Sequence, residues 1–198
     1  MGDATSLNVI SRKFDLLVPH GRLGEFITVA EDALRSLRET PYHAVLGRTF
    51  LGQADEAAEY VGRFFEKASK SVKVGALYFE MNGFETNPDL WFFNGFAYEK
   101  EGDIRDPDWL SDWAADEEEG FILTGMETLQ RAFAEICADE RQPLAVQLAG
   151  ELAEHLVNAR YMELIAKAHA RAKSALKALR GLPVFATAHD WDTVHRTL

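Results

Sequence analysis

The nine residues LWFFNGFAY, at positions 90–98, decide the fold that this sequence predicts. Five of them are aromatic, which is typical of a β-strand, and large apolar side chains at odd and even positions indicate a strand covered on both faces. The residues VKVGALYF, at 72–79, have the same character, and the turn formers NGFETNPD separate the two stretches. We therefore predict an antiparallel hairpin over about 72–81 and 90–98. Four of its large side chains are expected to be buried: Leu77, Phe79, Phe92 and Phe96.

The rest of the chain predicts helices around this hairpin. Apolar residues recur at the three- and four-residue spacing of an amphipathic helix over residues 23–37, 41–50, 55–68, 126–137 and 143–180. Short apolar runs predict further strands at 12–19, 120–123 and 184–188. The expected fold class is α+β, with a small antiparallel sheet packed against five to six helices in a single domain over residues 1–198.

The long helical stretch at 143–180 leaves two interpretations open. Its apolar stripe shifts around the helix by more than about 90° near Asn158, at the ideal helical pitch. Either the helix breaks near Asn158, or one long helix packs on different elements at its two ends.

The charge of the chain is unevenly distributed. The net charge is −11, and residues 73–142 hold 17 acidic and 5 basic side chains, a net charge of −12. Residues 1–72 and 143–198 carry net charges of −1 and +2. The acidic middle region would repel nucleic acid and attract a basic protein partner. We therefore expect a basic partner and no nucleic acid.

Composition also bears on the compartment. Cys137 is the only cysteine, so no intrachain disulfide can form, which fits a cytoplasmic protein better than a secreted one. The first residues lack the pattern of a secretory signal, and no uncharged apolar run approaches the ~20 residues that span a bilayer. With 47% hydrophobic residues, the chain can form a core without metal or disulfide. We expect a soluble cytoplasmic protein with no membrane partner and no cofactor, and its oligomeric state stays open.

The candidate binding residues lie in the acidic middle region. Trp109 and Trp113 are interspersed with acidic residues from 103 to 119, and this stretch lacks the alternating acids, central glycine and distal glutamate of a calcium-binding loop. In one interpretation the face is solvated and both tryptophans point inward against the sheet. In the other, the tryptophans lie one turn apart on a short helix, ringed by carboxylates, as at a protein interface. The predicted binding residues are Asp106, Asp108, Trp109, Asp112 and Trp113.

The favoured function is a non-catalytic one. We predict an interaction protein that presents this acidic, tryptophan-bearing surface to a basic partner, in an immunity-like or regulatory role. Small acidic intracellular proteins that neutralise toxins, such as bacterial immunity proteins, are similar in general character. That likeness is one of composition alone, and no motif carries it.

The alternative is a hydrolase or a metal-dependent enzyme. The sequence has no G-x-S-x-G, G-x-G-x-x-G or H-E-x-x-H motif. Glu151 and His155 lie one helical turn apart and approach the zinc motif H-x-x-E-H, with Glu151 in place of the first histidine. The competing explanation is a buried histidine bonded to a neighbouring carboxylate.

A second cluster near the C-terminus could also bind or activate a ligand. It consists of His189, Asp190, Asp192 and His195. Asp190 could equally cap a terminal helical turn, in which case its neighbours would be ordinary surface residues.

Overall fold

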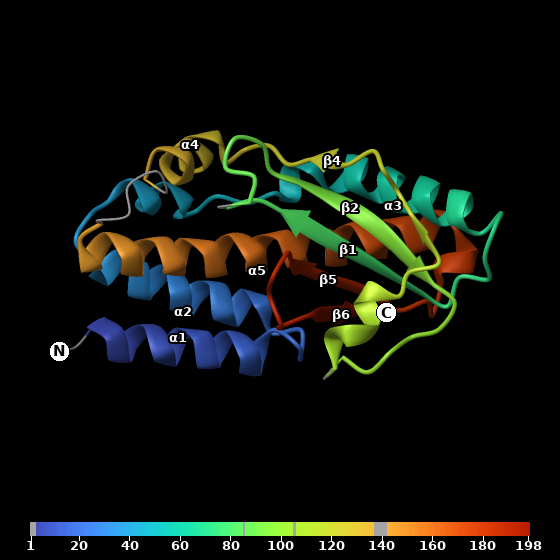
Figure 1. Cartoon of the computed structure of the whole chain (residues 1–198), viewed down its shortest axis with the longest axis horizontal. Coiled ribbons are helices and arrows are strands. Elements are labelled where there is room, and N and C mark those ends of the chain that lie inside the picture. Colours follow the sequence, from blue (N-terminus) through green and yellow to red (C-terminus); the bar gives the residue numbers. More distant parts are fainter. Residues whose placement is uncertain (1–2, 85, 105, 137–141) are drawn as a thin grey trace.

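A computed structural model describes residues 3–84, 86–104, 106–136 and 142–198 of the chain, so Cys137 lies outside the described residues. Within these ranges the chain has five α-helices, four short 3₁₀ helices and six strands (Figure 1). The helices are α1 (Asp3–Leu17), α2 (Leu23–Ser36), η1 (Pro41–Val45), η2 (Leu51–Gln53), α3 (Ala54–Ala68), η3 (Pro107–Ser111), α4 (Glu127–Ile136), α5 (Leu144–Ala175) and η4 (Lys177–Leu179). The strands are β1 (Ala76–Asn82), β2 (Phe92–Tyr98), β3 (Ala115–Asp116), β4 (Phe121–Ile122), β5 (Val184–Ala188) and β6 (His195–Thr197).

The six strands form one mixed sheet. Their order is β3-β2-β1-β5-β6, and β4 pairs with β2 on the same side as β3. β1 and β2 run antiparallel over their full length. β1 and β5 run parallel, from the pair Leu77–Val184 to the pair Met81–Ala188.

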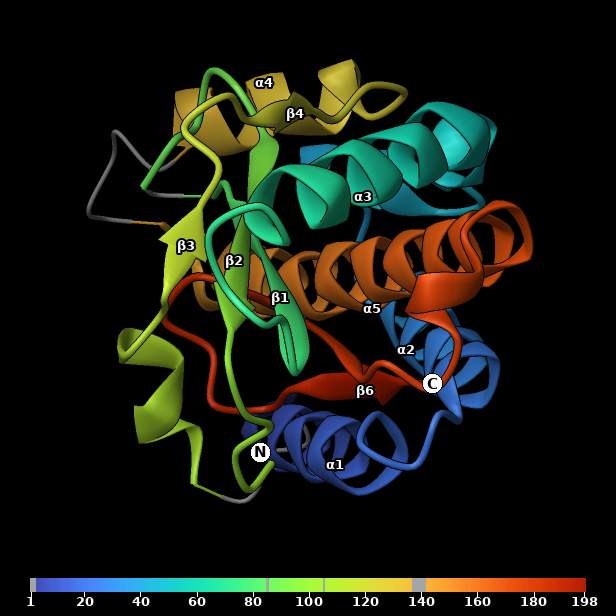
Figure 2. The same ribbon diagram turned by 90° about the vertical axis from the view of Figure 1, so that its right-hand side faces the viewer.

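The two faces of the sheet are covered differently. Figure 2 shows α3 and α5 on one side of the sheet, which we call the inner face, and the irregular segment that contains η3 on the other, the outer face. On the inner face, the rings of Phe64 of α3 and Phe79 have centroids 6.0 Å apart, and those of Tyr161 of α5 and Phe93 are 5.6 Å apart. The main core therefore lies between the sheet and these two helices.

The predicted hairpin is confirmed as an antiparallel pair, although residues 72–75 precede the strand rather than belonging to it. Leu77 and Phe79 are fully buried on the inner face, as expected. The expectation was wrong for Phe92 and Phe96, which point to the outer face and are only partly buried. Within the described ranges no α-helix covers the outer face at Phe92 and Phe96, so these side chains keep some contact with water.

The prediction of a purely antiparallel sheet was wrong. The strand expected at 184–188 is present as β5, but it pairs parallel to β1. β5 follows α5 in the chain, and a strand that is reached through a long crossover can run parallel to its neighbour. The coarser expectation, an α+β fold with a sheet packed against helices, is confirmed.

Two expectations for the N-terminal third were also wrong. Residues 12–19 do not form a strand, because Leu17 is still part of α1 and the chain then turns. Ile10, Phe14 and Leu17 are buried, and their spacing of four and three residues matches one helical face. The stretch at 41–50 forms only the short 3₁₀ helix η1 at its start rather than a longer helix, and η2 begins just after it at Leu51.

α5 is one continuous helix of 32 residues, which decides between the two interpretations of this stretch. Near its start, Gly150 lies against the ring of Tyr42 in η1. Near its end, Arg171 forms an ion pair of 2.9 Å with Asp55 of α3. The shift of the apolar stripe near Asn158 therefore reflects a change of packing partner along a single helix. Within the described ranges, neither α5 nor any other helix combines the length and the apolar character needed to cross a membrane.

The outer edge of β2 is covered by two strands of two residues each. β3 and β4, the latter within the strand predicted at 120–123, are separated by residues 117–120. In that gap the backbone N–H of Glu117 donates to the carbonyl of Gly95 at 2.9 Å, and the side-chain amide of Asn94 donates to the carbonyl of Glu117 at 2.9 Å. Lys67 of α3 pairs with the Glu117 carboxylate at 2.8 Å. The edge is thus held in place while its strand pairing is interrupted.

α5 also buries a histidine. The side chain of His169 is removed from solvent, and this desolvation lowers its pKa to about 4. A histidine in the unfolded chain has a pKa of about 6.5. The folded state therefore holds His169 neutral, and its stability is fully present above about pH 6.5 and falls as the pH drops from there towards the folded pKa.

We expect Phe93→Ala to lower the free energy of unfolding by about 3–5 kcal/mol, because it empties a site enclosed between the sheet and α5. Phe92→Ala, the matched change on the partly exposed face, should cost clearly less. Urea unfolding of both variants measures the difference. Equal costs would contradict the assignment of the inner and outer faces.

We expect acid to destabilise the protein partly through His169. Between pH 7.5 and pH 5, the free energy of unfolding of His169→Leu should fall by on the order of 1–2 kcal/mol less than that of the unchanged chain. Urea unfolding at several pH values, compared with the unchanged chain, tests this. If the pH dependence is the same in both proteins, His169 is not the group that takes up the proton.

Candidate functional site

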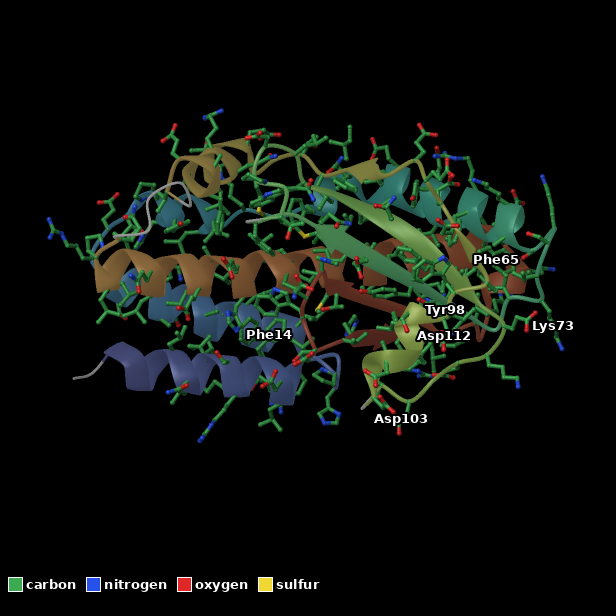
Figure 3. All side chains as sticks on the ribbon, in the orientation of Figure 1. Phe14, Phe65, Lys73, Tyr98, Asp103 and Asp112 are labelled. Atoms are coloured by element: carbon green, nitrogen blue, oxygen red, sulfur yellow. The ribbon has the colours of Figure 1, made fainter. Side chains whose placement is uncertain are left out.

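The segment between β2 and β3 carries all five predicted binding residues. It leaves the sheet after Tyr98, passes along the outer face, forms η3 and returns to the sheet edge at Ala115. Asp106 caps η3, since its carboxylate accepts a hydrogen bond from the backbone N–H of Asp108 at 3.4 Å. Figure 3 shows Tyr98 and Asp112 close together beside η3, with Asp103 further out on the loop.

Trp109 anchors this segment to the sheet. Its indole N–H donates to the carbonyl of Asp103 at 3.1 Å. Its ring makes edge contacts with Tyr98 and Phe185, with centroids 4.7 and 5.2 Å apart. Gly102 lies under the indole, where an added Cβ would be only 2.2 Å from its Cγ atom. Trp109 therefore points inward against the sheet, as in the first of the two interpretations of the sequence.

Trp113 is placed differently. It is 48% exposed, and its ring packs on Phe96 of β2 with centroids 5.2 Å apart. It follows the end of η3 rather than lying one turn from Trp109 within a helix, so the two tryptophans are not equivalent. The exposed part of the Trp113 indole is open to a ligand.

A cleft of about 380 Å³ lies between these two tryptophans and the end of β2, and we call it the tryptophan cleft. It brings together three of the predicted binding residues, Trp109, Asp112 and Trp113. Asp106 and Asp108 are exposed on the loop and on η3 and do not line it. The other lining residues are Tyr98, Glu99, Lys100, Glu101, Gly102 and Ala114.

The charged residues of the tryptophan cleft differ in whether they form ion pairs. Glu101 forms an ion pair of 2.6 Å with Arg196 of β6. Glu99 and Asp112 are exposed, and neither carboxylate forms an ion pair within the described ranges. Lys100 is the single basic residue among those that line the cleft. The cleft therefore offers two carboxylates that are free to meet a cation.

Sequence analysis missed the contribution of residues 98–102 to this site. The hydroxyl of Tyr98 donates to the carbonyl of Leu110 at 2.7 Å, which ties the start of the segment to η3. Position 102 requires glycine because the indole of Trp109, seven positions further along the chain, packs against it. No spacing rule in the sequence identifies such a contact.

The Glu151 carboxylate and His155 do not form the site that their spacing suggested. The His155 ring nitrogen Nδ1 lies 2.7 Å from the backbone carbonyl of Glu151, so the expected bond to a neighbouring carboxylate was also wrong. The imidazole packs edge-on against Trp191 and Phe14, with centroids 4.7 and 5.2 Å apart. Burial among these rings lowers the pKa of His155. This environment favours a neutral histidine with a packing role.

The four residues of the C-terminal cluster are also divided. His189 approaches the carboxylate of Glu80, with Nδ1 2.9 Å from Oε1, while its Nε2 lies 3.6 Å from Asp190. His195 is buried, and its Nδ1 lies 3.1 Å from the carbonyl of Val18. Asp192 is exposed.

The backbone at this cluster rules out the alternative in which Asp190 caps a helical turn. Asp190 has a positive φ of 62° in the turn after β5, and the chain that follows it forms β6 and no helix. Throughout the described ranges, no three histidine, cysteine, aspartate or glutamate side chains are grouped closely enough to hold a metal ion.

A second groove, of about 530 Å³, lies between α3 and the end of α5. Its floor is made of small and apolar residues, and its rim carries both signs of charge, including the Asp55–Arg171 ion pair. Asp55 pairs with Arg171 and Glu59 with Arg63, so most of the charges on this groove are already engaged.

Comparisons with known protein families, with curated proteins and with solved structures found no match to this chain.

We expect Gly102→Ala to destabilise the protein by about 1–3 kcal/mol, because a methyl group would displace the Trp109 indole. Gly52→Ala is the matched control, since a Cβ there meets nothing within 4 Å. Urea unfolding gives the stability of both variants, and tryptophan fluorescence reports the position of the indole. Identical behaviour of the two variants would contradict the close contact at Gly102.

Proposed function

We propose that this chain is a non-catalytic interaction protein that binds a basic partner protein through the tryptophan cleft and the acidic residues around it, in an immunity-like or regulatory role. The observation that carries the proposal is Trp113, which is about half exposed beside the unpaired carboxylate of Asp112. Aromatic residues dominate the binding energy of many protein interfaces.

The two tryptophans have separate roles in this proposal. Trp109 is engaged with Tyr98 and Phe185 and keeps the segment in place on the sheet. Trp113 supplies the surface that a partner would cover. The exposed carboxylates outside the cleft, Asp106 and Asp108 among them, would act at longer range by attracting a basic protein and raising its association rate.

The alternative as a hydrolase or metal-dependent enzyme has less support. Its candidate histidines lie in separate environments, with His155 among aromatic rings, His195 buried beside Val18, and His189 paired with Glu80. Catalysis by a general base requires that base and a nucleophile or activated water to converge on one point. His189 lies between the carboxylates of Glu80 and Asp190, and the residues that the structure describes contain no group of ligands that could hold a metal ion.

The binding proposal predicts a partner captured in a salt-dependent way from the organism that makes the protein. The triple variant with Asp106, Asp108 and Asp112 changed to Asn should slow association several-fold, and Trp113→Ala should speed dissociation, because steering charges and buried aromatics act on different rates. Capture at low and high salt, followed by kinetic measurement with the purified partner, provides the data.

Glu56→Gln removes one exposed acidic charge on α3, away from the cleft, and serves as the control that should leave binding unchanged. The proposal fails if no protein is captured at low salt. It also fails if the variants at the cleft bind as well as the Glu56 variant.

A further inference from the structure

The residues of the tryptophan cleft that are free to contact a ligand form a small set. Trp109 and Tyr98 are held by each other and by backbone carbonyls, and Glu101 is paired with Arg196. What remains is the exposed part of Trp113, with the carboxylates of Asp112 and Glu99 on the same cleft. The free groups are thus one aromatic surface, two carboxylates and the single ammonium group of Lys100.

This set matches a particular kind of cation. An aromatic face attracts a cation through its quadrupole, and tryptophan does so most strongly. A bare metal ion would have only two free carboxylates here, whereas calcium takes six to eight oxygen ligands. An organic cation with an extended apolar stem suits a cleft whose walls include tryptophan and alanine side chains.

We propose that the tryptophan cleft binds a single arginine side chain of the basic partner, with its guanidinium group against Trp113 and paired with Asp112. This inference rests on the proposed function and specifies what the cleft recognises. A volume of about 380 Å³ is at the lower end of the range for ligand sites, which suits one long side chain better than a folded motif.

Arginine fits these groups better than lysine. The guanidinium group is planar, so it can stack on the indole and still direct N–H donors at a carboxylate. It is also less strongly hydrated than an ammonium group, so less solvation is lost when it leaves water. Lys100 lines the same cleft but forms no ion pair with Asp112 or Glu99, so a guanidinium group does not have to displace it.

The test is a titration of the full chain, labelled with ¹⁵N, with the capped tripeptide acetyl-Gly-Arg-Gly-amide, followed by NMR. We expect saturable shifts confined to the backbone amides of Lys100, Gly102 and Ala114 and to the indole N–H of Trp113. The lysine tripeptide should bind at least about threefold more weakly, since it loses the stacked planar contact. The citrulline tripeptide, which is neutral and has a similar shape, should give no saturable shift.

Variants of the cleft locate the contact. Asp112→Asn should weaken binding of the arginine tripeptide by about fivefold or more, and Trp113→Leu should remove the preference for arginine over lysine. Glu56→Gln should leave both unchanged. Backbone amide shifts outside the cleft report whether each variant keeps its fold.

The outcomes separate this inference from the proposed function. Equal binding of the arginine and lysine tripeptides, or arginine shifts located elsewhere, would overturn the arginine assignment. If hexalysine still binds in that case and is lost in the Asp112 and Trp113 variants, the acidic cleft remains a binding surface for a basic partner. If neither the tripeptides nor hexalysine shifts the cleft resonances, both proposals fail.

Discussion

The packing of α3 and α5 against the inner face of β1 and β2 is the contact on which the rest of the structure depends. Phe79 and Phe93 are fully buried there, and Tyr161 of α5 lies against Phe93. The approach is close, because a Cβ on Gly95 would lie 2.7 Å from the ring of Phe64 in α3. Both helices therefore pack on the inner face, and the outer face is covered by the irregular segment that contains η3.

This one-sided packing explains where the candidate site lies. A segment without regular structure must satisfy its backbone groups through side chains and solvent, so it remains at the surface and can carry many charges. Trp109 and Gly102 fix it to the sheet, and the acidic residues between them and β3 face outward. The exposed acidic residues of this segment and the tryptophan cleft thus have one structural origin.

Much of the fold could be predicted from the sequence because its strongest signals are local. The aromatic stretch at 90–98 predicted the hairpin, and the helical spacing at 23–37 and 55–68 predicted α2 and α3. The parallel pairing of β1 with β5 was missed because it joins residues about a hundred positions apart, and pairing direction leaves no mark on composition. Residues 12–19 were misread since a short apolar run fits a strand and a helix alike.

The candidate site was predictable only in part. Tryptophan among carboxylates drew attention to Trp109, Asp112 and Trp113, but the sequence could not separate an anchoring tryptophan from an exposed one. That difference arises from contacts with Gly102, Phe185 and Phe96, which lie on other parts of the chain. The histidines illustrate the converse, since neighbours in sequence such as His189 and His195 point to different surroundings.

The broken edge of β2 has a consequence for how the molecule behaves at high concentration. A long, flat edge strand presents free backbone groups on which another chain can add a strand, and this is a common route to aggregation. Here the outermost row is two strands of two residues, and residues 117–120 between them carry exposed glutamates. A neighbouring molecule would find no continuous ladder to extend and would meet like charges on approach. The acidic middle region thereby disfavours the pairing of another copy of this chain at this edge of the sheet.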